Sequence, residues 1–302
     1  MGENTKQDRS PLLPLRHAQG DFFVCDIFDA IPKADMASME HPIFTLSTKP
    51  DLKIRRYERN NLWAEIAPSA KGLATVHDRD ILIYCISQVI AAMNNGSKVY
   101  RTLRFKAYDL LVATNRGTDG RGYEQLKAAL ERLRGTTIST NITTGGVEQL
   151  DVFGLIDRAR VVRESRDGRM IDVEITLSDW VFNAIEQNDV LTLNKQYFQL
   201  RKPLERRLYE IIRKQCGRKS ETRINLSTLH EKTGSTSASH EFKRLIQNII
   251  KDDIEHNHMP DFSIRLENQT LIARPKQDYQ RVYTGKNVRI DETKTKPTLQ
   301  AI

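Results

Sequence analysis

Apolar residues recur three and four positions apart in four long segments of the chain, the spacing of one buried face of an α-helix. These predicted helices cover residues 77–96, 123–135, 203–217 and 237–254. The first ends in an Asn-Asn-Gly sequence and the third has a proline in its first turn, and both signals are typical of helix ends.

Segments rich in β-branched residues lie between these helices and predict strands. Residues 43–48 and 52–59 are expected to pair through a turn at 49–51, because proline and aspartate favour turns. A second hairpin is expected at 262–275, with its turn near Asn268. The other predicted strands are 22–28, 62–67, 101–105, 136–144, 147–164, 169–178 and 222–226. Shorter helices are predicted at 107–115, 179–187 and 227–234, the last with Ser227 as N-cap.

The predicted elements follow the same order twice. Each block contains a long helix, a short strand, a short helix, a turn, a second helix and a hairpin. The last four form the winged-helix arrangement, which is a helix-turn-helix followed by a β-wing. The expected fold class is therefore α+β with tandem winged-helix domains. In such a fold, residues 123–134 and 240–251 are counterparts, each at the position of a recognition helix.

The expected domain organisation has four parts. Residues 1–19 are polar, contain two prolines and predict a flexible N-terminal arm. Residues 20–189 are expected to form a winged-helix domain with added strands, and residues 190–276 a winged-helix DNA-binding domain. The polar and basic residues 277–302 predict a flexible tail.

Charge and composition narrow the class of partner and the compartment. The chain of 302 residues carries a formal net charge of +8, which favours an anionic partner such as nucleic acid. Its three cysteines form no Cys-x-x-Cys pair, which favours a reducing compartment. The polar N-terminus predicts no signal peptide, and the uncharged run 81–97 is too short for a membrane span. A cytoplasmic protein without membrane association is expected.

The segment 237–254 combines an apolar face with a basic one. Four side chains at helical spacing form its core-facing stripe: Phe242, Leu245, Ile246 and Ile249. Their burial contributes roughly 6–12 kcal/mol gross, at about 1.5–3 kcal/mol each, so the helix has a structural reason to form. The opposite face carries the side-chain types that contact base edges and phosphates, namely His240, Lys243, Arg244, Gln247 and Asn248.

Acidic residues limit which part of this helix would approach DNA. Asp252, Asp253 and Glu255 lie at its C-terminal end, where they would repel a phosphate. The N-terminal half, Ser239 to Gln247, is therefore expected to face DNA, and Asp252 onward is not.

Further DNA contacts are predicted outside this helix. The hairpin carries Arg265 and Arg274, which would lie along the backbone or in the minor groove. The preceding helix and loop offer phosphate contacts from Arg206, Arg207, Lys214, Arg218 and Lys219. The helix at 123–134 and the turn before it offer a weaker or partly protein-facing surface of Arg121, Gln125, Lys127, Arg132 and Arg134. Each of these side chains would serve equally well in a solvated surface without a ligand.

Three stretches resemble a known family. They are NRGTDGRGYEQLKAALERLRGTTISTNI (115–142), RRLYEIIRKQCG (206–217) and KTGS (232–235). The chain resembles the plasmid replication initiator protein A (RepA-type) family over roughly residues 20–276. That family is similar to the wider group of iteron-binding initiators, which have two winged-helix domains.

The resemblance implies a function and partners. It implies binding to direct repeats (iterons) in double-stranded DNA at a plasmid origin, local origin melting, and recruitment of the host initiator and the replicative helicase. It also implies a homodimer in equilibrium with the monomer, dimerisation through the first domain, repression of the initiator's own gene, and association with the plasmid or nucleoid. By resemblance, most base contacts fall to Lys243, Arg244, Gln247 and His240 on the second recognition helix.

Two other functions compete with this interpretation. A rolling-circle nickase needs a tyrosine nucleophile and a His-hydrophobic-His metal pair, but the only close pair, His256 and His258, flanks the polar Asn257. An ATP-driven initiator needs GxxxxGK[ST], which the sequence does not contain. A winged-helix transcriptional regulator without a replication role would use the same helices as an initiator. We expect a non-enzymatic protein with no catalytic residues, no metal and no cofactor.

Overall fold

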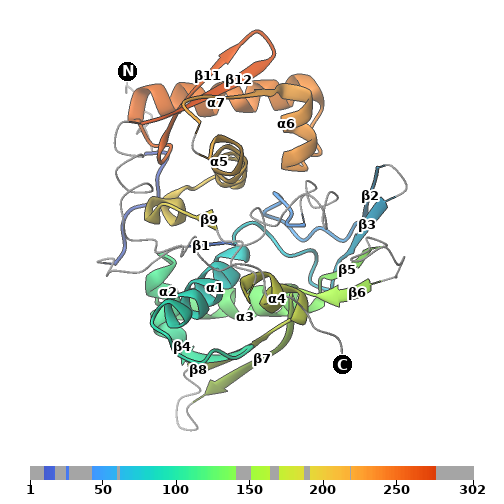
Figure 1. Ribbon diagram of the computed structural model, residues 1–302, viewed down its shortest axis with the longest axis vertical. Coiled ribbons are helices and arrows are strands. Elements are labelled where there is room, and N and C mark those ends of the chain that lie inside the picture. The colour runs from blue at the N-terminus through green and yellow to red at the C-terminus, as the bar shows by residue number, and fades with distance from the viewer. Residues whose placement is uncertain are drawn as a thin grey trace, which may run out of the picture.

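The computed structural model describes residues 10–17, 25–26, 43–59, 62–140, 151–163, 170–186, 191–217 and 219–276. Its elements form two units stacked along the long axis of the molecule (Figure 1). The first unit contains residues 43–186 and the second contains residues 191–276, and each has its own cluster of buried apolar side chains. Ile83 belongs by sequence to the first unit but packs in the second cluster. Among the described residues, no helix is both long and apolar enough to cross a membrane.

The first unit follows the predicted order of elements. Its elements are α1 (Arg79–Asn94), β4 (Thr102–Lys106), α2 (Ala107–Ala113), α3 (Gly120–Gly135), β7 (Ile156–Arg163), β8 (Met170–Leu177) and α4 (Asp179–Glu186). Strands β4, β8 and β7 form an antiparallel sheet in which β8 is central. The first strand therefore pairs with the last, so the hairpin folds back onto the start of the block.

The second unit repeats this topology. It consists of α5 (Pro203–Cys216), β10 (Thr222–Asn225), α6 (Leu226–Thr233), α7 (Ser239–His256), β11 (Phe262–Glu267) and β12 (Thr270–Pro275). The sheet order is β10-β12-β11, so the first strand again pairs with the last strand of the hairpin. The predicted duplication of element order is confirmed, and the matching strand order extends it to the sheets.

A second sheet distinguishes the first unit from the second. Strands β2 (Arg55–Arg59), β3 (Leu62–Ala67), β5 (Thr137–Thr140) and β6 (Asp151–Gly154) pair antiparallel in that order. The predicted pairing of 43–48 with 52–59 is therefore wrong. Strand β2 pairs with β3 instead, and Thr45 makes an isolated parallel bridge to Thr75. The physical reason is burial, because Ile43, Phe44 and Thr45 lie in the first core rather than at a sheet edge.

The chain segment before α1 also contacts both units. Strand β1 (Cys25–Asp26) pairs with β9 (Leu191–Thr192), and the 3₁₀ helix η2 (Lys195–Gln199) follows β9. The Leu13 amide donates to the Gln199 carbonyl at 2.7 Å, and the Arg16 amide donates to Asn115 Oδ1 at 2.8 Å. Residues 10–17, predicted as part of a flexible arm, are thus held by backbone hydrogen bonds between η2 and the end of α2. Residues 1–9, the rest of the arm up to 19 and the tail at 277–302 lie outside the described residues.

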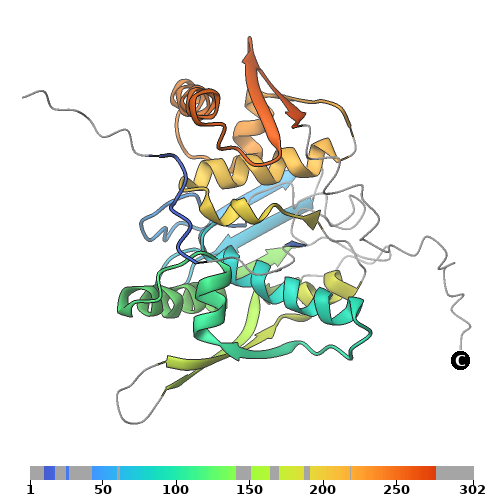
Figure 2. The same ribbon diagram turned by 90° about the vertical axis from the view of Figure 1, so that its left-hand side faces the viewer.

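Helix α5 is the helix of the second unit that faces the first unit, and it is buried on nearly every side (Figures 1 and 2). Pro203 occupies its first turn as predicted, and Gly217 follows its end with φ of 49°. Leu208, Ile211 and Ile212, which recur at helical spacing along it, are buried. Five of its charged residues are buried as well, namely Glu205, Arg206, Arg207, Glu210 and Arg213, whereas Lys214 is exposed. The sequence pattern of a half-exposed basic helix therefore does not hold for most of α5.

Ion pairs between α1 and α5 join the two units. Arg206 Nη1 contacts both carboxylate oxygens of Asp80, at 2.6 and 2.7 Å, and its Nε and Nη2 donate to the carbonyls of Leu200 and Phe198. Arg79 Nη1 lies 2.5 Å from Glu210 Oε2. All four side chains of these two pairs are at most 3% exposed. Removing one partner from a buried pair leaves an uncompensated charge, so these contacts must form together for the two units to close.

We expect Asp80→Ala to lower the free energy of unfolding by about 3–5 kcal/mol, because the Arg206 guanidinium would stay buried without its carboxylate. Urea unfolding followed by circular dichroism measures this loss. Asp157→Ala is the matched control, since Asp157 lies 3.4 Å from Arg101 in a pair that is 43% and 34% exposed. The control should cost at most about 1 kcal/mol. Equally small losses in both variants would show that the Asp80–Arg206 pair does not hold the units together.

Candidate nucleic-acid interface

Helices α6 and α7 are joined by a short turn that is fixed at both ends. Asn225 caps α6 by accepting from the Ser227 amide at 2.9 Å, so the predicted N-cap, Ser227, is wrong by two residues. Gly234 ends α6 in the left-handed region with φ of 67°. The His230 ring stacks on the Phe242 ring at 4.4 Å between centroids, which sets α6 against the start of α7.

The hairpin of β2 and β3 also touches this turn. Arg55 Nη1 donates to the Gly234 carbonyl at 3.3 Å, while Arg55 Nη2 contacts Asp51 Oδ2 at 2.6 Å. Figure 1 shows β2 and β3 reaching from the first unit toward α6. Sequence reasoning missed this contact, because nothing in the local pattern of 51–55 indicates a partner 179 residues away.

The buried face of α7 matches its predicted apolar stripe closely. Phe242, Ile246 and Ile249 are buried, Leu245 is half-buried, and Ile250 joins the buried set. The helix is therefore anchored in the second core by the side chains that its periodicity indicated.

The opposite face of α7 points to solvent. His240, Arg244, Gln247 and Asn248 are exposed, and Lys243 is half-buried. Arg244 makes two hydrogen bonds to Glu241, at 2.6 and 2.8 Å, within the same exposed face. The structure thus brings all five predicted residues of this helix to one accessible surface.

The acids at the end of α7 have structural contacts. Asp252 Oδ2 lies 2.5 Å from Lys202 Nζ, and Asp253 Oδ1 accepts from the Met259 amide at 2.7 Å.

His258 is fully buried with Nε2 3.3 Å from Glu205 Oε1, whereas His256 is exposed. The two histidines therefore do not converge. Within the described part of the chain, no group of three or more potential metal-ligating side chains occurs.

The hairpin and the strand beside it carry exposed arginines. Arg265 lies 2.9 Å from Glu267, and Arg274 lies 2.6 Å from Glu221. Arg223 on β10 shares Glu221 at 2.6 Å and is 59% exposed. Sequence reasoning missed Arg223, although the alternation of TRIN places Thr222 and Ile224 inward and Arg223 outward. These arginines lie on one face of the three-stranded sheet, because Arg223 and Arg265 both pair with Ile272 and Arg274 follows it two residues later.

Two predicted phosphate contacts on α5 are corrected by the structure. Arg206 is buried against Asp80, as described above. Arg207 is 6% exposed, lies 3.0 Å from Glu210 Oε2 and donates to the Lys232 carbonyl. Both guanidinium groups are engaged inside the protein, because the carboxylates they need lie in the core. Lys214 and Lys219 are exposed, and Arg218 lies outside the described residues.

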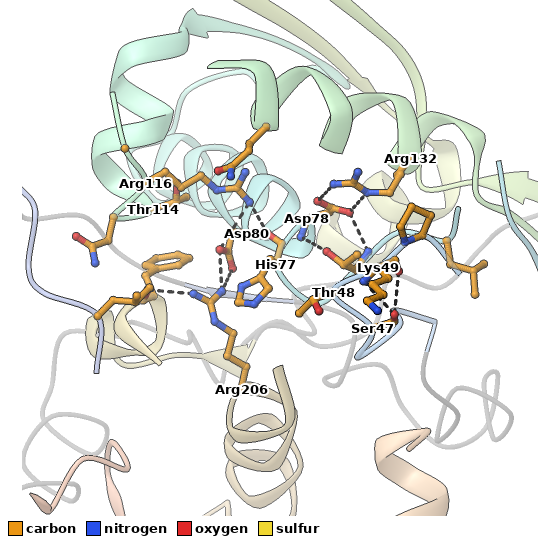
Figure 3. A pocket seen from close by; sticks show the side chains of 18 of the residues that line it. Ser47, Thr48, Lys49, His77, Asp78, Asp80, Thr114, Arg116, Arg132 and Arg206 are labelled. Carbon is orange, nitrogen blue, oxygen red and sulfur yellow. Dashed lines mark hydrogen bonds and ion pairs between the residues drawn. The ribbon is translucent and has the colours of Figure 1, made fainter. Parts of the chain in front are cut away.

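Helix α3 presents part of its predicted surface. Arg121, Gln125, Lys127 and Arg134 are exposed. Arg132 instead makes two hydrogen bonds of 2.7 Å to Asp78 (Figure 3), and these hydrogen bonds raise the pKa of Arg132. In Figure 2, α3 and α7 both lie toward the left of the molecule, α7 in the upper unit and α3 in the lower. Four of the five predicted residues on α3 are therefore accessible, while Arg132 is held by Asp78 instead.

The glycine-rich turn before α3 has a steric origin. A side chain at Gly122 would place its Cβ 1.8 Å from the Gly117 carbonyl oxygen, so only glycine fits there. Asp119 caps the helix by accepting from the Gly122 amide at 2.9 Å. The GTDGRG sequence thus forms a tight turn between α2 and α3 and caps the start of α3.

Comparisons with known proteins agree with this architecture. The family model for replication initiator protein A matches residues 33–264. A curated protein of Wigglesworthia glossinidia brevipalpis, described as "Putative replication protein", is 38% identical over 249 residues, which cover 81% of this chain and 89% of that protein.

Two solved structures with a similar fold are of RctB. Domains 2 and 3 of RctB superpose with a TM-score of 0.59 at 13% identity, covering 83% of this chain and 98% of that one. A second structure of RctB domains 2-3 gives a TM-score of 0.55, also at 13% identity, with 80% and 97% covered. At this level of identity the likeness concerns the fold alone.

Proposed function

The chain belongs to the replication initiator protein A family, and from this premise we propose that it initiates plasmid replication by binding short direct repeats in the origin. The observation that carries the proposal is the outward face of α7. Five polar or basic side chains lie on it, opposite the buried apolar face that packs in the second core. Both units are proposed to be winged-helix domains, with α6 and α7 as the helix-turn-helix of the second unit and β11–β12 as its wing.

Base contacts are assigned to the N-terminal half of α7. His240, Arg244 and Gln247 carry donors and acceptors that match base edges in the major groove. All three are exposed, and Lys243 on the same half of the helix is half-buried. The N-terminal end of a helix also favours a nearby phosphate. At the other end, Asp252 and Asp253 are fixed by Lys202 and the Met259 amide. The chemistry of the helix thus gives it one end suited to DNA.

Phosphate contacts are assigned to exposed basic residues of the second unit. Lys214, Lys219, Arg223, Arg265 and Arg274 supply them, whereas Arg206, Arg207 and Arg132 are excluded because their guanidinium groups are held by internal carboxylates. Such contacts position a protein on DNA without specifying sequence. The exposed arginine pairs with Glu221, Glu241 and Glu267 are weak, so phosphate can replace the carboxylate.

The remaining parts of the proposal follow from the family. The chain would act by binding rather than catalysis, promote local melting of the origin, recruit the host initiator and replicative helicase, and repress its own gene. A homodimer in equilibrium with the monomer is proposed, with the first unit in contact with its partner copy. The proposed location is the cytoplasm, on the plasmid. Exposed Arg121, Gln125, Lys127 and Arg134 on α3 would serve as a second, weaker DNA surface.

We expect DNase footprinting of the region that flanks the gene to show protection of an array of direct repeats at physiological salt. Protection of the repeats together with repeat-dependent plasmid replication would distinguish an initiator from a transcriptional regulator that binds only a promoter. If no repeated element is protected, the proposed function is wrong. A nicked DNA product covalently linked to the protein in the presence of Mg²⁺ would instead indicate a nickase.

We expect Arg244→Ala to weaken binding to the repeat by about 1–3 kcal/mol and to relax sequence preference, because a bidentate contact to a base edge is lost. Fluorescence anisotropy with repeat and scrambled duplexes measures both effects. Arg104→Ala is the matched control, since Arg104 is an exposed arginine paired with Asp172 at 2.8 Å in the first unit. It should leave both affinities unchanged.

Lys219→Ala separates the two kinds of contact in the same assay. Loss of a phosphate contact should weaken binding to both duplexes alike and reduce the salt slope by about one. If Arg244→Ala behaves in this way, with unchanged sequence preference, α7 does not make the base contacts.

A further inference from the structure

A cavity of about 380 Å³ lies where the two units and the N-terminal segment meet. It is lined by the segment 10–17, the loop at 47–50, the start of α1, the end of α2, one face of α3, and residues of η2 and α5. Figure 3 shows labelled side chains that converge on it from the loop at 47–50, the start of α1, the end of α2, α3 and α5. No residue of α7 lines the cavity, and Gln125 of α3 is the one lining residue that is also assigned to the second, weaker DNA surface. The proposed base contacts of α7 therefore do not account for the cavity.

The lining of this cavity is strongly basic. It contains six cationic side chains and only two carboxylates, Asp78 and Asp80. Each carboxylate already has an arginine: Arg132 contacts both oxygens of Asp78 at 2.7 Å, and Arg206 contacts both oxygens of Asp80. The two acids that would repel an anion are therefore neutralised, and the other cations determine the local charge.

Four cations remain around the opening. Within the described residues, Arg16, Lys49 and Lys71 have no ion-pair partner, and all three are exposed at the edge of the cavity. Arg116 donates to the His77 carbonyl and lies 3.8 Å from Asp80, so its charge is only partly compensated. Guanidinium and ammonium groups gathered around one hollow are the donors that bind phosphate oxygens.

His77 lies beside two arginines of the lining. Burial, together with the charges of Arg206 and Arg116, holds the pKa of His77 well below its ordinary value. A neutral imidazole leaves the positive charge of the cavity to its arginine and lysine side chains. Figure 3 shows His77 between the Arg206–Asp80 and Arg132–Asp78 pairs.

The fold fixes the backbone that carries Arg16 and Lys49 before any ligand arrives. Asn115 Oδ1 accepts from the Arg16 amide at 2.8 Å, and Asn115 Nδ2 donates to the Pro14 carbonyl at 3.1 Å, which fixes the segment that carries Arg16. Ser47 Oγ donates to the Lys49 carbonyl at 2.8 Å, which closes the loop that carries Lys49. A preorganised set of donors binds a ligand at a lower entropic cost.

We propose that this cavity binds the phosphate groups of a small polyphosphorylated molecule, of the class of a nucleoside di- or triphosphate. Its volume falls within the range of roughly 300–1,000 Å³ that is usual for small-molecule sites, and a DNA duplex cannot enter a hollow of that size. The bound anion would contact side chains of both units and of the segment 10–17. Binding would therefore stabilise the interface between the units.

The test uses the full chain and inorganic pyrophosphate, ADP and ATP as probes in isothermal titration calorimetry at constant ionic strength. Wild type should bind at least one probe saturably, with one molecule per chain and a rise in Tm. Lys49→Gln combined with Lys71→Gln should weaken this binding about tenfold or more, because two charge-assisted contacts are lost. Lys98→Gln combined with Lys106→Gln is the matched control, which removes two exposed lysines outside the lining and should change the affinity less than about twofold.

Each contrary outcome is decisive. No saturable binding of any probe at about 10 mM, or equal binding by both double variants, overturns the proposal. Both double variants are expected to fold, because all four lysines are exposed. Circular dichroism checks this. The same proteins are then titrated with duplex DNA. If the Lys49/Lys71 variant loses DNA affinity while wild type binds no probe, the phosphates belong to DNA and the small-molecule site is rejected. That result would leave the proposed function intact.

Discussion

The arrangement of the molecule depends on buried ion pairs between the first turn of α1 and helix α5. Glu210 connects three side chains in this network. It contacts Arg79, Arg207 and the hydroxyl of Tyr197 at 2.5–3.0 Å, and its own side chain is not exposed to water. Ions taken out of water are costly unless every partner is present, so this network tolerates only one orientation of the two units. The orientation in turn sets how α3 lies relative to α7 and encloses the cavity beside Asp80. The same few residues therefore determine both the geometry of the proposed DNA interface and the site proposed for phosphates.

The elements of the fold could be predicted from sequence wherever hydrophobic periodicity alone decides them. Helix α7 and its buried face follow from the spacing of Phe242, Ile246 and Ile249, and the repeated order of elements follows from comparing the two blocks. Periodicity cannot find partners that are distant in sequence. Arg206 is read from its neighbours as a surface cation, yet its partner Asp80 lies 126 residues away. Arg132 and Asp78, 54 residues apart, are the same case.

Local competition explains the smaller differences between prediction and structure. Asn225 and Ser227 are both good helix caps, and Asn225 takes the role because the strand ends there and its side chain reaches the amide two residues on. Residues 43–48 have strand-like composition, but burial of Ile43 and Phe44 draws them into the first core and leaves β2 to pair with β3. In both places, several local solutions were acceptable by propensity, and a tertiary contact selected one.

The two units share one topology, but the arginines of the equivalent helices α3 and α7 pair with carboxylates that differ in burial. Arg132 of α3 holds Asp78, whose side chain is 3% exposed, so replacing that carboxylate by a phosphate would strand a buried acid. Arg244 of α7 holds Glu241 on the same exposed helix face, where water screens the pair and makes it weak. A phosphate or a base edge can therefore displace Glu241 at little cost, whereas displacing Asp78 would leave a buried carboxylate without its partner. This difference in burial, rather than the number of basic residues on each helix, favours α7 over α3 for the proposed DNA interface.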